Sequence, residues 1–190
     1  MAPFMLAPGI DHLALIGNFL PRKCGIATYT TDTFNALKQR YPDLQVDVYA
    51  MDDHPGRYDY PDAVTRAIPQ HDRAAYLDAA RAIEASGAQA LWIQHEYGIW
   101  GGDDGAYVLD FVRALSIPAI ATLHTVLQHP TPSQRSILTE LVERVDMTVV
   151  MSRSAASLLE TAYGVDARRG KRRGRRRNRA RKRPAACRTE

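Results

Sequence analysis

Several residues with the chemistry to bind or transfer a polar group come directly after short apolar runs of the sequence. His95, Glu96 and Tyr97 follow the apolar segment 90–93, and His124 follows the segment 119–123. A histidine can donate to a sugar hydroxyl or a phosphate, or move a proton near neutral pH. The spacing therefore predicts a polar site assembled from the ends of several strands. For His124, the alternative is a structural histidine that bonds a neighbouring carbonyl.

A glycine-containing turn forms another candidate binding segment. Gly17 ends the apolar run 13–16, and Arg22, Lys23 and Gly25 follow before a helix-forming stretch. The free N–H groups and the dipole of a helix N-terminus favour an anion, and the two basic side chains add positive charge. This turn therefore predicts a site for a phosphorylated ligand. The alternative is a plain strand-to-helix connection, because one such turn is a weak signal.

Other polar residues permit further chemistry. Cys24 is either a nucleophile activated by the helix dipole and Arg22 or a small packed residue. His95 and Glu96 form a proton-transfer pair or bind a hydroxyl, and we predict no metal site because no second ligand pair has a suitable spacing. Asp52 and Asp53 could accept ribose hydroxyls, but no G-x-G-x-x-G follows the first apolar run.

Two long loops are candidates for substrate contacts. The segment 52–70 contains His-Pro-Gly and Tyr-Pro, and the segment 95–105 is rich in glycine. Loops of this length in a compact domain are often functional. In the second loop, Tyr97, Ile99 and Trp100 either form an aromatic floor for a sugar ring or pack the loop onto the domain.

The elements that must position these residues alternate between strand and helix. Strands are expected at 12–16, 45–51, 90–93, 119–123 and 147–151, with a short one near 64–68. Helices are expected at 28–40, 73–86, 106–115, 132–144 and 153–163, and Asp72, Thr131 and Ser152 are suitable N-caps. Near-continuous apolar strands indicate a sheet covered on both faces. We therefore predict an α/β, Rossmann-like three-layer domain with a mainly parallel sheet, whose strand-to-helix loops share one edge.

The charge divides the chain into a body and a tail. Of the 25 Lys and Arg residues, 13 lie in 167–190 beside one of the 21 acidic residues, which leaves 12 basic and 20 acidic residues elsewhere. We therefore expect a lead-in at 1–11, an acidic domain at 12–166 and a disordered, Arg-rich tail at 167–190. A second functional class follows from this tail: a non-catalytic α/β module that binds nucleic acid or another anionic surface.

The sequence also bears on location. Two cysteines, Cys24 and Cys187, give neither a disulfide framework nor a metal-binding pattern, which favours a reducing compartment. The first residues lack the features of a signal peptide, and no window has the ~20 apolar residues of a membrane span. We expect a cytoplasmic protein without a transmembrane segment, which could also bind peripherally to a membrane surface.

Four motifs together resemble the N-terminal half of bacterial family-4-type glycosyltransferases with the GT-B fold. They are G-x-F-x-P-R-x-C-G-I-A-T at 17–28, Q-H-E-Y-G-I-x-G-G at 94–102, L-H-T-V-L with P-T-P within 123–132, and V-V-M-S at 149–152. The resemblance covers about residues 13–166. Taken jointly the motifs are fairly specific, although any one alone is not.

The resemblance implies a retaining, nucleotide-sugar-dependent transferase with no tightly bound metal or other cofactor. In such enzymes this domain shapes the acceptor site, which would be lined here by His95, Glu96 and Tyr97. The histidine near the transferred sugar matches His124, the expected catalytic residue. The first glycine loop approaches the donor diphosphate. The residues that match it are Gly17, Arg22 and Gly25.

The sequence departs from this family after Asp166, where the composition changes to an Arg-rich run. A GT-B enzyme needs a second domain that supplies the nucleotide pocket. We therefore expect a truncated gene or a shifted reading frame, and an isolated chain with little or no activity. The expected partners are a nucleotide-sugar donor and a carbohydrate or lipid-linked acceptor.

Overall fold

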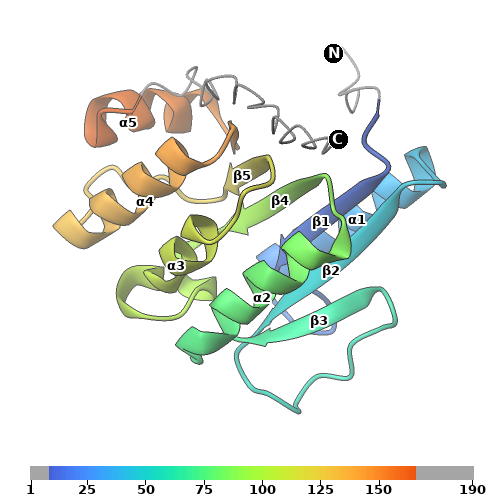
Figure 1. The fold of residues 1–190 in the computed structure, drawn as a ribbon. Coiled ribbons are helices and arrows are strands. Elements are labelled where there is room, and N and C mark those ends of the chain that lie inside the picture. The colour runs from blue at the N-terminus through green and yellow to red at the C-terminus, as the bar shows by residue number, and fades with distance from the viewer. Residues whose placement is uncertain (1–8, 166–190) are drawn as a thin grey trace, which may run out of the picture.

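The computed structural model describes residues 9–165, which form a six-stranded parallel sheet and its covering helices (Figure 1). The strands are β1 (His12–Gly17), β2 (Gln45–Asp52), β3 (Val64–Pro69), β4 (Ala90–His95), β5 (Ala119–Leu123) and β6 (Met147–Val150). The helices are α1 (Gly25–Arg40), α2 (Arg73–Ser86), α3 (Tyr107–Arg113), α4 (Pro132–Arg144) and α5 (Arg153–Tyr163), with short 3₁₀ turns at Tyr97–Ile99 and Asp103–Gly105.

The strand order is β3-β2-β1-β4-β5-β6, and every neighbouring pair is parallel. The chain leaves β1 toward β2 and later returns to β4 on the other side of β1. The order therefore reverses between β1 and β4, which is the switch point of a doubly wound sheet. The predicted Rossmann-like, mainly parallel α/β fold is confirmed.

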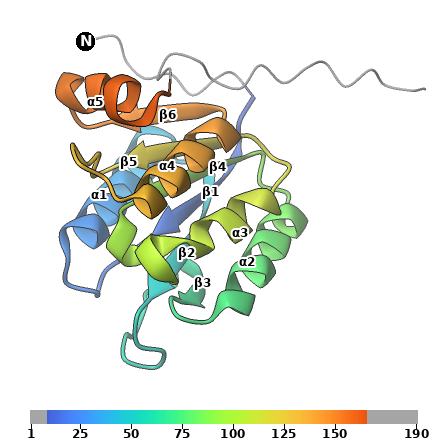
Figure 2. The same ribbon diagram turned by 90° about the vertical axis from the view of Figure 1, so that its left-hand side faces the viewer.

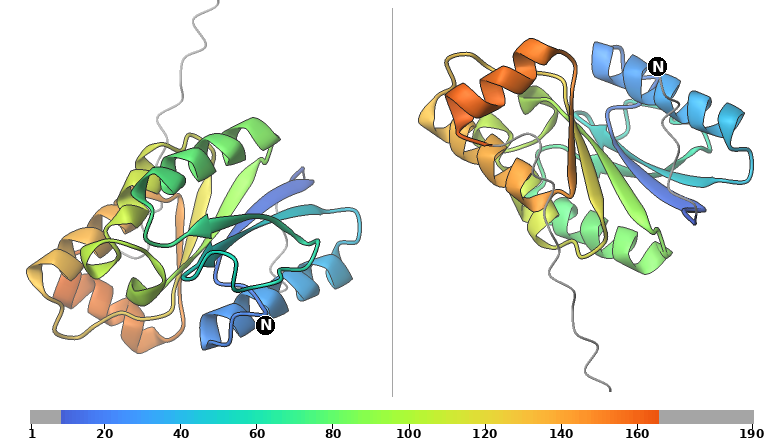
Figure 3. Two further views of the ribbon diagram at one scale, coloured as in Figure 1. Left: turned by 90° about the horizontal axis from the view of Figure 1, so that it is seen from below. Right: turned by 90° about the horizontal axis from the view of Figure 1, so that it is seen from above.

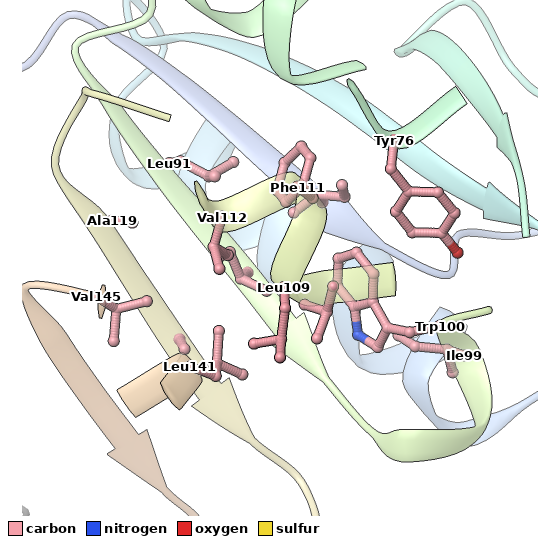
Figure 4. Packing of buried hydrophobic residues seen from close by; sticks show 14 of the residues in the cluster. Tyr76, Leu91, Ile99, Trp100, Leu109, Phe111, Val112, Ala119, Leu141 and Val145 are labelled. Atoms are coloured by element: carbon pink, nitrogen blue, oxygen red, sulfur yellow. The ribbon is translucent and has the colours of Figure 1, made fainter. Parts of the chain in front are cut away.

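Helices cover the two faces of the sheet unequally. Helices α2, α3 and α4 lie on one side of the strands and α1 lies on the other (Figures 2 and 3). Helix α5 packs against α4 and β6. The main hydrophobic core lies between the strands and α2, α3 and α4, where Leu91, Phe111 and Leu141 are fully buried (Figure 4). This cluster contains most of the buried hydrophobic residues of 9–165.

The helix ends follow from capping side chains that the sequence reveals. Asp72 accepts a hydrogen bond from the Ala74 amide, and Ser152 accepts one from the Ala155 amide. Thr131 forms a capping box at the start of α4. Such caps satisfy N–H groups that have no partner inside the helix.

Two elements differ most from the expectation, and α3 (Tyr107–Arg113) is also shorter at both ends than the expected 106–115. Helix α1 begins at Gly25 rather than Thr28, because the Cys24 thiol caps it by accepting from the Ala27 amide at 3.4 Å. The segment Val64–Pro69 is a full strand that pairs with β2 and extends the sheet to six strands. Its central residues are exposed, as befits an edge strand. Residues 1–8 of the expected lead-in and the whole expected tail at 167–190 lie outside the described residues.

Candidate functional site

The polar residues gather at the carboxyl ends of β1, β4 and β5, on both sides of the switch point. Asn18 follows β1, Gln94 and His95 end β4, and His124 follows β5. The His124 amide donates to the His95 carbonyl at 2.9 Å, which ties the two strand ends together. Ligands of open α/β sheets bind in the crevice at such a point. The polar candidate residues therefore lie where ligands bind to open α/β sheets.

His124 is half-buried and held on two sides. Its Nε2 lies 2.9 Å from Oε1 of Gln94, and the Tyr29 ring of α1 meets the imidazole edge-on, with the ring centroids 4.7 Å apart. Burial lowers the pKa of His124, while the nearby Glu96 carboxylate acts in the opposite direction. A lowered pKa leaves the imidazole mainly neutral near pH 7, so it can donate or accept a hydrogen bond.

Three fully buried side chains at the switch point have polar atoms without a hydrogen-bond partner within residues 9–165. The unpaired atoms are Oδ1 of Asn18, Nε2 of Gln94 and both ring nitrogens of His95. An unpaired buried polar atom costs about 1–3 kcal/mol, so each needs an explanation. Because these unpaired atoms lie together at the switch point, we infer that they are kept there for binding rather than for the stability of the fold.

His95 is buried more deeply than the sequence predicted. Its side chain has no exposed surface, and the Tyr97 ring packs edge-on against it with the centroids 5.2 Å apart. Burial, with a smaller contribution from His124, lowers the pKa of His95 to about 3. In this conformation His95 does not face solvent, so the expected direct contact with an acceptor requires the loop above it to move.

Glu96 is half-buried and holds two neighbouring segments. One carboxylate oxygen accepts from the Tyr97 amide at 3.0 Å, and the other accepts from the Thr125 hydroxyl. The carboxylate therefore joins the loop after β4 to the loop after β5. Tyr97 is buried, and its hydroxyl contacts the Tyr163 hydroxyl at 3.3 Å and donates to the Gln134 carbonyl at 3.4 Å. Its polar end thus faces α4 and α5.

The N-terminus of α1 lies beside Asn18. The side-chain Nδ2 of Asn18 donates to the Cys24 sulfur at 3.2 Å, and the same sulfur caps the helix. Gly25, the first residue of α1, is exposed, and a Cβ there would meet nothing within 4 Å. This leaves room for a ligand against the helix start. Of the two interpretations of Cys24, the small packed residue fits its position, because its sulfur accepts hydrogen bonds from Asn18 and Ala27.

Arg22 is engaged within the domain. Its guanidinium donates to the Met51 carbonyl and to Oε1 of Gln70, each at 3.3 Å, and lies 3.5 Å from an oxygen of Asp53. These contacts join the loop after β1 to the ends of β2 and β3. A diphosphate role for Arg22 therefore requires the side chain to exchange at least one of these contacts for the ligand.

Gly17 is needed for close packing. A Cβ at this position would lie 2.8 Å from Cβ of Gln94 and 3.1 Å from the Thr30 hydroxyl oxygen. Real side chains do not approach so closely, so glycine lets β1, β4 and α1 converge here. The residue shapes the site by positioning Gln94, which in turn holds His124.

The glycine-rich loop after β4 packs onto the domain. Ile99 and Trp100 are buried, and Trp100 packs against Phe111 and Tyr76 in the core (Figure 4). The Gly101 amide donates to the Tyr76 hydroxyl at 2.8 Å. Of the two alternatives for this loop, packing describes Ile99 and Trp100, and the aromatic floor is wrong for these two residues because their side chains face the core.

Within residues 9–165, no three side chains of His, Cys, Asp or Glu are grouped to hold a metal ion. None of the helices in that range is long and apolar enough to cross a lipid bilayer.

Sequence reasoning missed Asn18, Gln94 and Tyr29. Asn18 and Gln94 are amides at the ends of apolar strands, a position where burial of a polar side chain is unexpected. A polar amide at the end of an apolar strand was therefore the sequence signal that could have identified both residues. Tyr29 lies in α1, and no local pattern predicts that its ring meets His124.

The sheet order and the polar edge define a doubly wound α/β domain. A family model, Glycosyltransferase Family 4, matches residues 24–171, and the chain belongs to this family. Among solved structures, the fold is similar to that of the apo form of the lipopolysaccharide outer core galactosyltransferase WaaB, with a TM-score of 0.55 and 12% identity. The match covers 82% of this chain and 43% of that one, so the chain spans less than half of the galactosyltransferase. No curated protein matches this chain.

Proposed function

We propose that this chain is the acceptor-side half of a retaining glycosyltransferase that transfers a sugar from a nucleotide-sugar donor to a carbohydrate or lipid-linked acceptor. The observation that carries the proposal is the convergence of His124 with the unpartnered polar atoms of Asn18, Gln94 and His95 at the switch point. A sugar diphosphate offers many hydroxyl and phosphate oxygens, which suit such a set of donors and acceptors. The family match supports the same class of reaction.

The donor diphosphate would lie at the N-terminus of α1. The first amides of an α-helix have no partner inside the helix; here Cys24 binds the Ala27 amide, and Gly25 leaves open space in which a phosphate could reach the helix start. Negative charge that develops on the leaving diphosphate is stabilised by N–H groups that are already oriented. Gly17 would contribute indirectly, by allowing the strands to approach, and Arg22 would bind phosphate after releasing Asp53.

His124 would act on the sugar itself. A half-buried, mainly neutral imidazole can donate a hydrogen bond to a hydroxyl of the transferred sugar. It can also accept one from such a hydroxyl. Gln94 and Tyr29 restrict its ring to one orientation. Glu96 would form the acceptor side of the site, and the buried His95 and Tyr97 would reach an acceptor only if the loop after β4 moves. We further propose that the protein acts in the cytoplasm, peripherally to the membrane where its acceptor is lipid-linked.

A binding experiment tests the placement of the donor. The full chain, labelled with ¹⁵N, is titrated with inorganic pyrophosphate and with nucleoside diphosphates. The proposal expects the largest amide shifts at 18, 25–27 and 124. Asp53→Asn should strengthen binding, because it removes the counter-charge of Arg22. Shifts confined to other parts of the domain, or affinity that is the same in Arg22→Ala, would contradict it.

A matched pair separates ligand binding from folding. Gly25→Ala places a methyl group in open space, so the fold should be unchanged while pyrophosphate binds more weakly. Gly98→Ala also places a methyl group in open space, but in the loop after β4, and pyrophosphate should bind as it does in the parent. Equal affinity in both variants would exclude the helix start as the phosphate site.

A further inference from the structure

The loop after β5 begins with His124, and hydrogen bonds hold it at two further positions. The Thr125 hydroxyl donates to the Glu96 carboxylate in the loop after β4. Two residues further on, the Leu127 amide donates to the hydroxyl oxygen of Tyr163 at 3.1 Å. Tyr163 is the last residue of α5 and lies 36 residues away along the chain. The backbone that follows His124 is therefore fixed by both a neighbouring loop and a distant helix.

The hydroxyls of Tyr163 and Tyr97 connect this loop to α4. Their oxygens are buried and lie 3.3 Å apart, and the Tyr97 hydroxyl also donates to the Gln134 carbonyl at 3.4 Å. Because each hydroxyl has a single proton, Tyr163 donates to the Tyr97 oxygen when Tyr97 donates to Gln134. The hydrogen bonds therefore run in one direction, from the Leu127 amide through both tyrosines to the first turn of α4.

Tyr97 also joins this chain of hydrogen bonds to Glu96. The Tyr97 amide donates to the Glu96 carboxylate at 3.0 Å, and the same carboxylate accepts from Thr125. Burial, followed by the hydrogen bond with Tyr163, raises the pKa of Tyr97, so its hydroxyl keeps its proton at neutral pH. A buried polar network whose members have partners favours one conformation, and this one encloses the segment 124–127.

We propose that Tyr163 and Tyr97 are positioning residues that hold the loop after β5, and with it the His124 imidazole, in one place. The proposal rests on the proposed function only for the role of His124, because the hydrogen bonds belong to the fold. It gives Tyr97 a role other than the expected contact with an acceptor. Its hydroxyl acts on the site through Tyr163 and the loop, from the side of α4 and α5.

Removing one hydroxyl from the full chain tests the proposal and keeps the aromatic ring in the core. Tyr163→Phe takes the acceptor away from the Leu127 amide, so the segment 124–127 should open more often to water. Hydrogen exchange at the Leu127 amide should be faster by about 2- to 10-fold, the change expected for one lost hydrogen bond. Burial is the main cause of the lowered pKa of His124, so NMR titration of its ring protons should show that pKa rising toward 6.5.

Tyr76→Phe is the matched control for this variant. The Tyr76 hydroxyl is also buried and makes two hydrogen bonds, to the Gln70 carbonyl and from the Gly101 amide, each at 2.8 Å. Its removal should destabilise the domain to a similar degree, but neither partner belongs to the network around His124. The pKa of His124 and the exchange rate at Leu127 should therefore remain as in the parent.

Tyr97→Phe is the second variant and decides the question if Tyr163→Phe does not fold. It breaks the same chain of hydrogen bonds at the next hydroxyl, so the pKa of His124 should move in the same direction. An unchanged His124 titration in either folded variant would overturn the proposal. An equal shift in Tyr76→Phe would also overturn it, because general loosening of the domain would then explain the effect.

The same samples titrated with inorganic pyrophosphate separate this proposal from the proposed function. Tyr163→Phe should bind pyrophosphate as the parent does, because the N-terminus of α1 is not part of the network. A weaker affinity in this variant would mean that the disruption extends beyond the loop, and would contradict a positioning role. If the parent itself does not bind pyrophosphate, the proposed donor site is wrong, while the comparison of His124 titrations still decides the role of Tyr163.

Discussion

The imidazole Nε2 of His124 lies 2.9 Å from Oε1 of Gln94, a fully buried side chain on the neighbouring strand. The contact joins the ends of β4 and β5 beside the switch point of the sheet. It gives the imidazole a fixed orientation, while burial lowers its pKa. Gln94 is therefore a positioning residue for the proposed catalytic histidine.

Replacing Gln94 by glutamate tests this contact directly. The variant places a carboxylate beside the imidazole, and an opposite charge within ~4–6 Å favours the protonated histidine by about 1–3 pKa units. We expect Gln94→Glu to raise the pKa of His124, measured by NMR titration of its ring protons. An unchanged titration in a folded variant would mean that the two side chains are not in contact in solution.

His95 should make the stability of the domain depend on pH. Its pKa of about 3 in the folded chain is far below the value of 6.5 for an exposed histidine. Between these values the unfolded chain binds a proton that the folded chain does not. This contribution to stability is complete above pH ~6.5 and falls by up to about 1.4 kcal/mol per pH unit below it.

The measurement for His95 is urea unfolding at several pH values. His95→Leu removes the titrating group, so its free energy of unfolding should change less steeply between pH 6.5 and 4 than that of the parent. The same slope in both proteins would mean that His95 is protonated or exposed in the folded state.

Gly101 should tolerate no side chain, unlike a nearby glycine in the same loop. A Cβ at Gly101 would lie 1.9 Å from the Gln70 carbonyl oxygen, whereas a Cβ at Gly98 would meet nothing within 4 Å. Overpacking of this kind costs about 1–3 kcal/mol or more. Thermal unfolding should show Gly101→Ala to be clearly destabilised and Gly98→Ala to lie within about 0.5 kcal/mol of the parent. Equal stability of the two variants would contradict the packing of this loop.

The Arg-rich segment 167–190 should bind nucleic acid without sequence preference. Each phosphate contact contributes about −0.9 to the slope of log K against log salt on duplex DNA. We expect fluorescence anisotropy with a labelled duplex to show steeply salt-dependent binding by the full chain. A chain that ends at residue 166 should lose this binding but keep its response to pyrophosphate. Binding that survives the truncation would place the anionic surface site in the domain instead.

The order of elements was predictable because local signals mark most of their ends. Asp72, Thr131 and Ser152 each precede a helix whose first residue the sequence places correctly. Helix α1 was the exception, because a cysteine is an uncommon cap and Thr28 offered a more typical one. Strand β3 was expected only as a short segment, since an edge strand with exposed residues lacks a clear apolar pattern.

The convergence of the candidate site residues at one edge of the sheet was predictable, but their contacts were predictable only in part. Parallel strands deliver His95 and His124 to one edge, as the sequence indicates. The engagement of Arg22 with Gln70 and Asp53 depends on segments up to 48 residues apart, and no local pattern reveals it. The burial of Gln94 likewise depends on how closely β1 approaches at Gly17.

Sugar transfer by a fusion enzyme tests the central claim most directly. Residues 1–166 are joined to the donor-binding half of a family member, and transfer from a panel of nucleotide sugars is measured with and without His124→Ala. We predict no transfer by the present chain alone, transfer by the fusion, and a loss of about 10²-fold or more in kcat for the folded His124→Ala fusion. Full activity of that variant would contradict the assignment of His124 and of the edge between β4 and β5 as the reaction site.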